Sequence, residues 1–511
     1  MARFLQKESI NVKLSCALIS QVKGRMKMES IKKYEIYPMY IDGQWVGNEN
    51  EFFTEVTNPA TKEVIGAVPT GGALEAKQAV DAAHAAFKVW SKKTAEERYR
   101  ILMKWHQLID ENKNEIAKIM TTEQGKPLHE ALGEVQYANS FISWYAEEGK
   151  RVYGETIPAS HPHKRILVRK EPVGVVAAIT PWNFPAAMIT RKVAPALAAG
   201  CTCVVKPANQ TPLTALKIAE LAHEAGIPNG VLNIITGRSA EIGDAWLKDT
   251  RVTKITFTGS TEVGKTLMRG AAENVKKVSL ELGGNAPFIV MDDANLEKAA
   301  EGLIQSKFRN AGQTCICTNR IYVQEGVADE FVKIFQSKLE GLKVGNGLEA
   351  GTDIGPLIDR AAYDKVTGLV NDVIEKGGKI TYAGEKPADE GYYHAPMILT
   401  DINENMECMK DEIFGPLAPI ATFKTEEEVI ERANNSRYGL AAYIFTENLS
   451  RAFRMSEGVE YGIVGLNDGL PSTAQAPFGG FKESGLGREG GHFGIEEFLE
   501  IKYISISLSE G

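Results

Sequence analysis

The segment from Val173 to Met291 constrains the fold most, because it alternates short β-branched runs with runs of helical periodicity. Strands are predicted at Gly174–Thr180 and Cys203–Lys206, and helices follow them at Pro185–Ala199 and Pro212–Ala225. Strands that alternate with helices in this way favour a parallel, doubly wound sheet of the dinucleotide-binding type.

The alternation continues towards Met291, and a helical segment precedes it. The next elements expected are strands at Val231–Thr236 and Lys254–Phe257 and a helix at Glu262–Ala272. The segment 72–148 contains two predicted helices, at Leu74–Trp90 and Ala95–Gln124. We expect these two helices to pack against the sheet, because a parallel sheet is covered on both faces.

A second α/β unit is predicted after Glu281. Its expected helices are 295–308, 328–341, 359–376 and Thr425–Asn435. The tail Glu496–Ser507 ends in an alternating apolar and polar stretch that could pair at a sheet edge, and a short strand pair is predicted within Arg151–Lys170. A chain of 511 residues is too long for one hydrophobic core, so two or three domains are expected.

Charge and hydropathy exclude several classes of partner. The net charge is −8, and no basic stripe interleaved with aromatic residues is present. We therefore expect no nucleic-acid partner. No apolar run reaches the roughly 18 residues that suggest a membrane span, so no membrane partner is expected.

The six cysteines are too few and too scattered for the disulfide framework of a secreted protein, so a reducing compartment is favoured. They are Cys16, Cys201, Cys203, Cys315, Cys317 and Cys408. Two Cys-x-Cys pairs raise the alternative of a zinc site, but the eight histidines do not stand at ligand spacing beside them. We expect no metal.

Residues 1–30 are basic and lack periodicity. An organelle transit peptide has this composition, and so does a segment translated from a start codon upstream of the natural one. Met26 and Met28 are alternative starts, and we favour a disordered or spurious extension. The expected location is the cytoplasm, or the mitochondrion for a transit peptide.

A cysteine and a carboxylate stand in positions suited to covalent catalysis. Cys315 follows an amphipathic run at a Gly-Gln-Thr break, and Glu281 ends an apolar strand upstream, in Leu-Glu-Leu-Gly-Gly-Asn. A thiol nucleophile and a general base are the two groups that a thioester mechanism needs. A helix N-terminus or nearby hydrogen-bond donors could lower the pKa of the thiol.

These two motifs resemble the signature pair of the aldehyde dehydrogenase superfamily, and the resemblance extends from about Tyr37 to Tyr503. It implies that Cys315 forms a thiohemiacetal and that Glu281 activates water to release a free acid. Cys317 matches only part of the superfamily. It is interpreted as a packing residue or as a redox partner of Cys315 in a reversible, activity-blocking disulfide.

The resemblance also implies an α/β architecture with a Rossmann-like dinucleotide-binding domain, a second α/β catalytic domain and a small β oligomerisation arm. A homodimer or homotetramer is expected, and edge coverage within one subunit is the alternative for the arm. The expected division is an extension at 1–30, the dinucleotide-binding domain at 31–148 and 171–281, the catalytic domain at 282–483 and the arm at 149–170 and 484–511.

Asn183 lies between a predicted strand and helix, in Thr-Pro-Trp-Asn-Phe-Pro. Its amide could donate to a developing oxyanion together with the backbone N–H of Cys315. A helix cap is the alternative role for an asparagine in such a place.

The cofactor is predicted from several segments. The loop Phe257–Gly264 follows a strand and opens a helix, so its backbone N–H groups could face a pyrophosphate. Asn209 replaces the acid that would repel a 2′-phosphate, so NADP or NAD is expected. With the resemblance, the cofactor-binding candidates are Thr180, Pro181, Trp182, Lys206, Asn209, Gly259, Ser260, Val263, Glu412 and Phe414.

Within the superfamily the sequence is most similar to the succinate-semialdehyde dehydrogenases. This similarity implies that Arg191, Arg309 and Ser472 bind the distal carboxylate of the aldehyde, and it implies a role in 4-aminobutyrate degradation. Two guanidinium groups and a hydroxyl are chemically suited to a carboxylate. The alternatives are glutarate or 2-oxoglutarate semialdehyde as substrate, a non-catalytic relative, or a thiol-dependent protein without nicotinamide.

Overall fold

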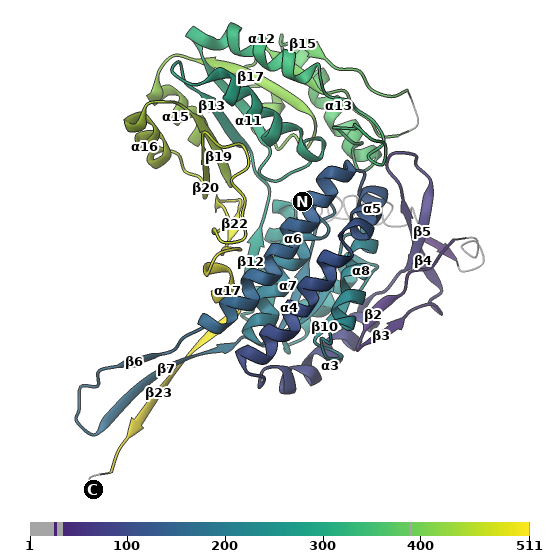
Figure 1. The fold of residues 1–511 in the computed structure, drawn as a ribbon, viewed down its shortest axis with the longest axis vertical. Coiled ribbons are helices and arrows are strands. Elements are labelled where there is room, and N and C mark those ends of the chain that lie inside the picture. Colours follow the sequence, from purple (N-terminus) through teal and green to yellow (C-terminus); the bar gives the residue numbers. More distant parts are fainter. Residues whose placement is uncertain (1–24, 28–33, 389–390, 510–511) are drawn as a thin grey trace, which may run out of the picture.

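The computed structural model describes residues 25–27, 34–388 and 391–509, arranged as two α/β units and a projecting arm (Figure 1). The first unit contains an eight-stranded sheet in the order β22-β12-β11-β8-β9-β10-β2-β3. Its five central strands are parallel: β12 (Lys277–Glu281), β11 (Val252–Thr258), β8 (Val175–Ile179), β9 (Thr202–Lys206) and β10 (Leu232–Ile234). The antiparallel edge strands are β22 (Gly485–Leu486), β2 (Met39–Ile41) and β3 (Gln44–Val46).

The order of the parallel strands reverses between β8 and β11. From β8 the chain proceeds through β9 to β10, and it then returns to the other side of β8 to form β11 and β12. Adjacent crossovers therefore leave the sheet in opposite directions, which opens a crevice at the carboxyl ends of these strands.

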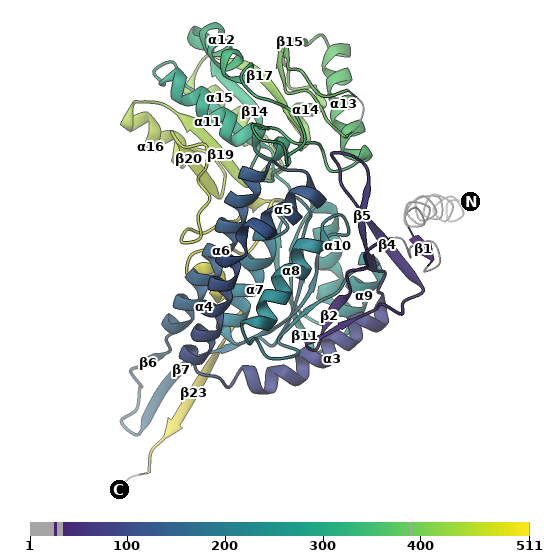
Figure 2. The same cartoon turned by 45° about the vertical axis from the view of Figure 1, so that its right-hand side comes forward.

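Helices cover both faces of this sheet because the parallel strands are apolar on both sides. Val176 and Ala178 of β8 belong to one buried cluster, whereas Val175 and Ala177 belong to another. The first cluster includes helices α4 (Ala95–Glu111), α5 (Lys113–Gln124), α6 (Leu128–Glu148), α7 (Ala187–Ala199) and α8 (Pro212–Glu224). The second includes α3 (Ala73–Trp90), α9 (Ser239–Lys248) and α10 (Thr261–Ala272), which Figure 2 brings into view.

The predicted single helix Ala95–Gln124 is wrong, because the structure divides it at Asn112 into α4 and α5. Asn112 has φ −101° and ψ 9°, and its side-chain Nδ2 donates to the carbonyl oxygen of Leu108 at 2.8 Å. The same carbonyl oxygen accepts the backbone N–H of Asn112 at 3.1 Å, so the asparagine side chain adds a second hydrogen bond to the last turn of α4. Helix α9 was not predicted.

The second unit contains a seven-stranded sheet in the order β15-β16-β17-β14-β13-β19-β20. Its strands are β15 (Lys379–Ala383), β16 (Met397–Thr400), β17 (Leu417–Phe423), β14 (Thr318–Gln324), β13 (Ala286–Val290), β19 (Ala441–Phe445) and β20 (Ile463–Leu466). Its longer helices are α11 (Leu296–Phe308), α12 (Ala328–Leu339), α13 (Arg360–Glu375), α15 (Glu426–Asn434) and α16 (Leu449–Gly458). The predicted α/β class is confirmed in both units.

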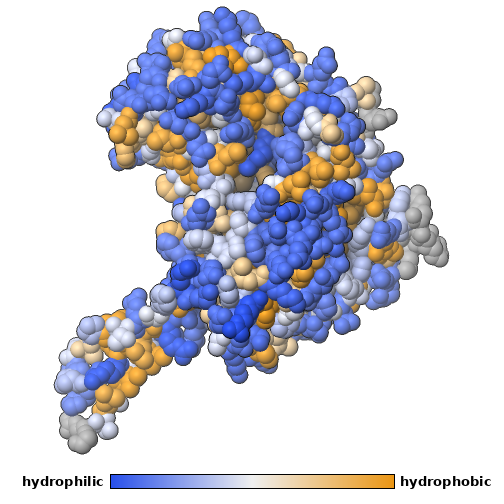
Figure 3. Space-filling view, in the orientation of Figure 1, coloured by the Kyte–Doolittle hydropathy of each residue, from blue (hydrophilic) through white to orange (hydrophobic). Residues whose placement is uncertain are grey.

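The arm is a three-stranded antiparallel sheet that extends away from both units (Figure 1). Strand β7 (Lys164–Pro172) pairs with β6 (Glu155–Ile157) and with the C-terminal strand β23 (Leu499–Ser507), as the predicted strand pair and tail require. Ile501 and Tyr503 are 74% and 62% exposed, and apolar surface follows the arm in Figure 3.

The N-terminal region adds a small sheet of its own. Strand β1 (Arg25–Lys27), within the predicted extension, pairs with β4 (Phe52–Thr57), which also pairs with β5 (Val64–Pro69). The rest of the predicted extension 1–30 lies outside the described residues. Across the described ranges, no helix combines the length and apolar character needed to cross a membrane.

Candidate active site

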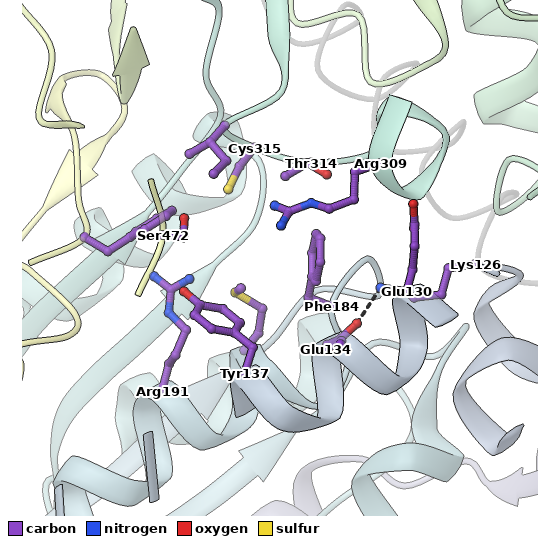
Figure 4. Close-up of a pocket in the computed structure, with 14 residues that line it drawn as sticks. Lys126, Glu130, Glu134, Tyr137, Phe184, Arg191, Arg309, Thr314, Cys315 and Ser472 are labelled. Atoms are coloured by element: carbon purple, nitrogen blue, oxygen red, sulfur yellow. Dashed lines mark hydrogen bonds and ion pairs between the residues drawn. The ribbon is translucent and has the colours of Figure 1, made fainter. Parts of the chain in front are cut away.

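Two cavities meet at Cys315. The arginine cavity, of about 220 Å³, is lined by Arg191, Arg309, Ser472 and other residues, including Cys315 (Figure 4). The sheet-end cavity, of about 270 Å³, is lined by residues that follow β8, β11 and β12 and again by Cys315. The thiol of Cys315 is therefore accessible from two chemically different sides.

The sheet-end cavity lies at the switch point of the first sheet. Its wall contains Pro181, Trp182 and Asn183 after β8, Gly259 and Ser260 after β11, and Leu282 and Gly283 after β12. Ser260 is the N-cap of α10, and its hydroxyl accepts a hydrogen bond from the N–H of Val263 at 3.4 Å. Dinucleotides bind at such a crevice, with the pyrophosphate at a helix N-terminus.

The second unit closes this cavity with Glu412 and Phe414. One carboxylate oxygen of Glu412 accepts from the backbone N–H of Gly284 at 3.2 Å, and burial raises the pKa of Glu412 to about 7. Phe414 packs edge-to-face on Trp182, with 5.5 Å between ring centroids. The cavity is thus formed by both units, as a cofactor site between two domains requires.

Lys206 and Asn209 lie at the carboxyl end of β9, outside the lining of the sheet-end cavity. The Nζ of Lys206 donates to Oδ1 of Asn209 at 2.6 Å and to the carbonyl oxygen of Pro207 at 2.9 Å. Burial lowers the pKa of Lys206 to about 7. Val263, the remaining candidate on α10, is 48% exposed, and Thr180 is buried.

Cys315 follows a backbone turn of unusual conformation. Asn310, Ala311 and Gly312 have φ values of 53°, 54° and 76°, so three successive residues occupy the left-handed region. This conformation costs a non-glycine residue roughly 1–2 kcal/mol. It reverses the chain between α11 and Cys315, so it sets the direction from which the thiol enters the cavities.

Hydrogen bonds to Asn310 hold this turn in place. Its backbone N–H donates to the buried carboxylate of Glu130 at 2.8 Å, and its Oδ1 accepts from Nε2 of Gln124 at 2.9 Å. Its Nδ2 donates to the carbonyl oxygens of Asn183 at 3.0 Å and Gln313 at 3.2 Å. The strained turn is therefore fixed by residues of the first unit.

The environment of Cys315 raises the pKa of its thiol to about 12, because burial outweighs the opposing effect of Arg191 and Arg309. The expectation that nearby donors lower this pKa is wrong for the protein without ligands. Cys315 lies in a turn after η2 (Arg309–Gly312). The thiol form therefore predominates at neutral pH.

Asn183 is buried beside this turn. Its side-chain Nδ2 donates to the carbonyl oxygen of Gln313 at 3.0 Å, two residues before Cys315. The alternative of a helix cap is wrong, because the N-cap of α7 is Ala186. The amide of Asn183 is therefore directed towards the nucleophile segment, where it can stabilise an oxyanion.

Glu134 of α6 caps the N-terminus of α7. One of its carboxylate oxygens accepts from the N–H groups of Ala186 at 2.9 Å and Ala187 at 3.2 Å. The other pairs with Lys126, whose Nζ also donates to the carbonyl oxygen of Asn183 at 2.8 Å. Both charged side chains are 1% exposed. Sequence reasoning missed this pair, since no local pattern links Lys126 to either partner.

Glu281 ends β12 and is buried, with one carboxylate oxygen lacking a hydrogen-bond partner. It lines neither cavity; its side chain lies against Gly479, where an added Cβ would come within 3.0 Å of Oε1. Burial raises the pKa of Glu281 well above its usual value, and the nearby Glu489 raises it further. A carboxylate in this state is a stronger base than an exposed one.

Glu489 connects two neighbouring basic residues of α7. Its Oε2 lies 2.8 Å from Nη2 of Arg191, and its Oε1 contacts Nζ of Lys192. Lys192 also donates to Oγ1 of Thr258 at 2.6 Å. Sequence reasoning missed both Lys192 and Glu489, which are separated by almost 300 residues.

The three side chains predicted to hold a carboxylate share the arginine cavity. Arg191 of α7 has its guanidinium carbon 3.9 Å from the ring centroid of Phe478. The hydroxyl of Ser472 is buried without a hydrogen-bond partner. Figure 4 shows Arg309 entering from the opposite side to Arg191. Such a cavity can hold an anion close to the Cys315 sulfur.

Cys317 is buried and has no disulfide partner. Nζ of Lys307 donates a hydrogen bond to Sγ of Cys317 at 3.4 Å. Burial raises the pKa of the Cys317 thiol. It lines neither cavity. Within the described part of the chain, no group of three or more His, Cys, Asp or Glu side chains could hold a metal ion.

The chain belongs to the aldehyde dehydrogenase family. The model of this family matches residues 45–504. The chain is 54% identical to the NADP-dependent succinate-semialdehyde dehydrogenase of Escherichia coli, over 92% of this chain and 97% of that protein. It is 55% identical to the glutarate-semialdehyde dehydrogenase of Pseudomonas putida, over 92% and 97%. The crystal structure of succinate-semialdehyde dehydrogenase from Burkholderia pseudomallei matches with a TM-score of 0.91 and 51% identity, over 92% and 98%.

Replacing Glu134 with Gln should lower the free energy of unfolding by about 3–5 kcal/mol, because it leaves the buried Lys126 ammonium without a carboxylate. Urea unfolding of both proteins measures the difference. The double variant Lys126→Met/Glu134→Gln carries neither charge of this pair and should recover part of the loss. Equal stability of the single variant and the wild type would contradict a stabilising role for the pair.

Proposed function

We propose that this protein oxidises succinate semialdehyde to succinate with NADP or NAD. The observation that carries the proposal is the arginine cavity, in which two guanidinium groups and a free hydroxyl accompany the Cys315 thiol. An aldehyde with a distal carboxylate satisfies these groups while its carbonyl carbon reaches the sulfur. The names of the relatives from Escherichia coli and Pseudomonas putida support an ω-carboxylate aldehyde.

The chemical steps follow from the residues. The Cys315 thiol loses its proton to water, and the sulfur then attacks the carbonyl carbon. Nδ2 of Asn183 and the backbone N–H of Cys315 stabilise the oxyanion that forms. The residues that line the sheet-end cavity would hold the nicotinamide, which would supply a hydride acceptor for the carbon bonded to the Cys315 sulfur. The resulting thioester is hydrolysed by water, from which Glu281 takes a proton.

The residues beside the sheet-end cavity have proposed roles in holding the cofactor. Ser260 and Val263, with Gly259, offer the α10 N-terminus to the pyrophosphate. Lys206 and Asn209 bind the adenosine ribose, and Glu412 binds the nicotinamide ribose. Thr180, Pro181, Trp182 and Phe414 form the adjoining wall.

Glutarate semialdehyde and 2-oxoglutarate semialdehyde are the nearest alternative substrates, because each carries an anion distal to the aldehyde. One methylene changes binding by only about 1–3 kcal/mol in a pocket, so the same cavity can admit more than one chain length. A non-catalytic role is disfavoured by the presence of Cys315, Asn183 and Glu281 in one region of the fold.

The domain division, assembly and compartment are part of the same proposal. The exposed apolar side chains of β23, including Ile501 and Tyr503, support an oligomerisation arm and a homodimer or homotetramer. Cys201, Cys203, Cys315, Cys317 and Cys408 are free thiols, which supports a reducing compartment such as the cytoplasm. Cys317 is proposed as the redox partner of Cys315 in a reversible disulfide.

The substrate assignment is tested with the variant Arg309→Met. Arg191 is ion-paired with Glu489, so its removal would also disturb that carboxylate, and Arg309 is the cleaner choice. Loss of a charge-assisted hydrogen bond should raise KM for succinate semialdehyde about tenfold to a hundredfold. KM for butanal should change little. Absorbance at 340 nm measures both, and wild-type turnover of butanal in preference to the semialdehyde would contradict the proposal.

The variant Glu281→Gln should separate the two halves of the reaction. Steady-state turnover should fall about 10²–10⁴-fold, because no carboxylate remains to activate water. Rapid mixing should still give a burst of about one reduced cofactor per subunit, since thioester formation does not use Glu281. Absence of a burst in the variant would assign Glu281 to a step before thioester hydrolysis. The variant Glu281→Asp serves as the conservative control.

The pH dependence of cofactor binding should show whether Lys206 contacts the 2′-phosphate of NADP. Its pKa of about 7 makes it a cation below pH 7 and neutral above, and only the cation attracts a 2′-phosphate. The ratio of KM for NADP to KM for NAD should therefore rise above pH 7, by up to about tenfold per pH unit. The variant Lys206→Met should give a flat ratio. A flat ratio in the wild type would exclude contact between Lys206 and the 2′-phosphate.

A further inference from the structure

Tyr137 of α6 reaches into the arginine cavity from the side opposite Cys315. In Figure 4 its ring extends from the helix so that the hydroxyl lies beside the Arg191 guanidinium, on the side facing Ser472. The hydroxyl oxygen is buried and has no hydrogen-bond partner among the residues that the structure describes. A buried hydroxyl without a partner is unfavourable, so a ligand atom at this place would relieve a defect of the empty cavity.

The position of the Tyr137 ring is fixed by packing. Phe141, one helical turn further along α6, contacts it edge-to-face with 5.0 Å between centroids and an interplanar angle of 76°. Burial also raises the pKa of Tyr137, so the phenol keeps its proton. The side chain therefore presents an O–H donor in a defined direction.

The arginine cavity contains other donor atoms that the protein leaves without hydrogen bonds. Among the described residues they are Nε and Nη2 of Arg191, of which Nη2 is ion-paired with Glu489, and the hydroxyls of Ser472 and Thr314. Together with Tyr137 and Arg309 they come from four different segments: α6, α7, the turn before Cys315, and the loop that contains Ser472. A carboxylate has two oxygens with about four lone-pair sites, so it can use donors that approach from several directions.

We propose that Tyr137 is a further specificity-determining residue, whose O–H donates a hydrogen bond to the distal anionic group of the aldehyde. This inference rests on the proposed function and adds a fourth donor to Arg191, Arg309 and Ser472. The phenol distinguishes an anionic end from an apolar one, because an apolar chain would leave the hydroxyl buried without a partner.

Tyr145 provides a matched control on the same helix. Its hydroxyl is also buried, but it lies against Gly494, where an added Cβ would come within 1.9 Å of the oxygen, and Tyr145 does not line the arginine cavity. The variants Tyr137→Phe and Tyr145→Phe therefore each remove one buried hydroxyl from α6, and only the first removes it from the cavity.

The experiment compares succinate semialdehyde with butanal for wild type, Tyr137→Phe and Tyr145→Phe, with each reaction followed at 340 nm. For Tyr137→Phe we expect KM for the semialdehyde to rise about tenfold or more, as for loss of a hydrogen bond to a charged group. Its kcat for the semialdehyde and both constants for butanal should stay within about twofold of wild type. Tyr145→Phe should leave KM for both aldehydes unchanged.

A second readout does not require turnover of succinate semialdehyde by the variant. Succinate retains the distal carboxylate, so its inhibition constant against butanal oxidation should rise in Tyr137→Phe as KM for the semialdehyde does. An unchanged inhibition constant, or an equal rise in KM for butanal and the semialdehyde, would overturn the inference. Failure of the proposed function is distinguishable, because the wild type itself would then prefer butanal.

Discussion

The backbone carbonyl of Asn183 is the point on which the site depends, because both halves of the molecule donate to it. Lys126 reaches it from the first unit at 2.8 Å, and Nδ2 of Asn310 reaches it from the turn before Cys315 at 3.0 Å. The segment of the proposed nucleophile, Cys315, and the proposed oxyanion-stabilising residue, Asn183, therefore share one hydrogen-bonded junction. Buried polar junctions of this kind are stable only when every member is satisfied, which explains why Glu134 and Gln124 complete it.

Charge is concentrated around this junction in a way that an apolar core would not tolerate. Arg191 and Lys192 are fully buried, and Glu489 lies between them as their common counter-ion. Glu281, which faces the same group of charges, keeps a raised pKa because burial and then Glu489 oppose its ionisation, while Arg191 and Lys192 act in the other direction. The same residues that make the cavity attractive to an anion thus also determine the basicity of the proposed water-activating carboxylate.

Local sequence patterns were sufficient for much of this picture. The strands β8 and β9 and the helix α8 follow from periodicity and proline placement, and the motif around Cys315 marked a residue that the structure places between two cavities. Local patterns did not predict the features that depend on residues far apart in the sequence. The pairing of Glu489 with Arg191 joins residues far apart in sequence, and the raised pKa of Cys315 comes from burial that only the assembled fold creates.

The pairing of β22 with β12 has a consequence for the order of folding. Glu281 pairs with Gly485 across this edge, and Glu489 follows four residues later. During synthesis, Arg191 and Lys192 emerge from the ribosome long before the carboxylate that neutralises them. The first sheet therefore remains incomplete, with two uncompensated cations on its central helix, until nearly the whole chain has been made. Contacts of such long sequence separation form slowly, so the pairing of β22 with β12 is expected to be a late step in folding.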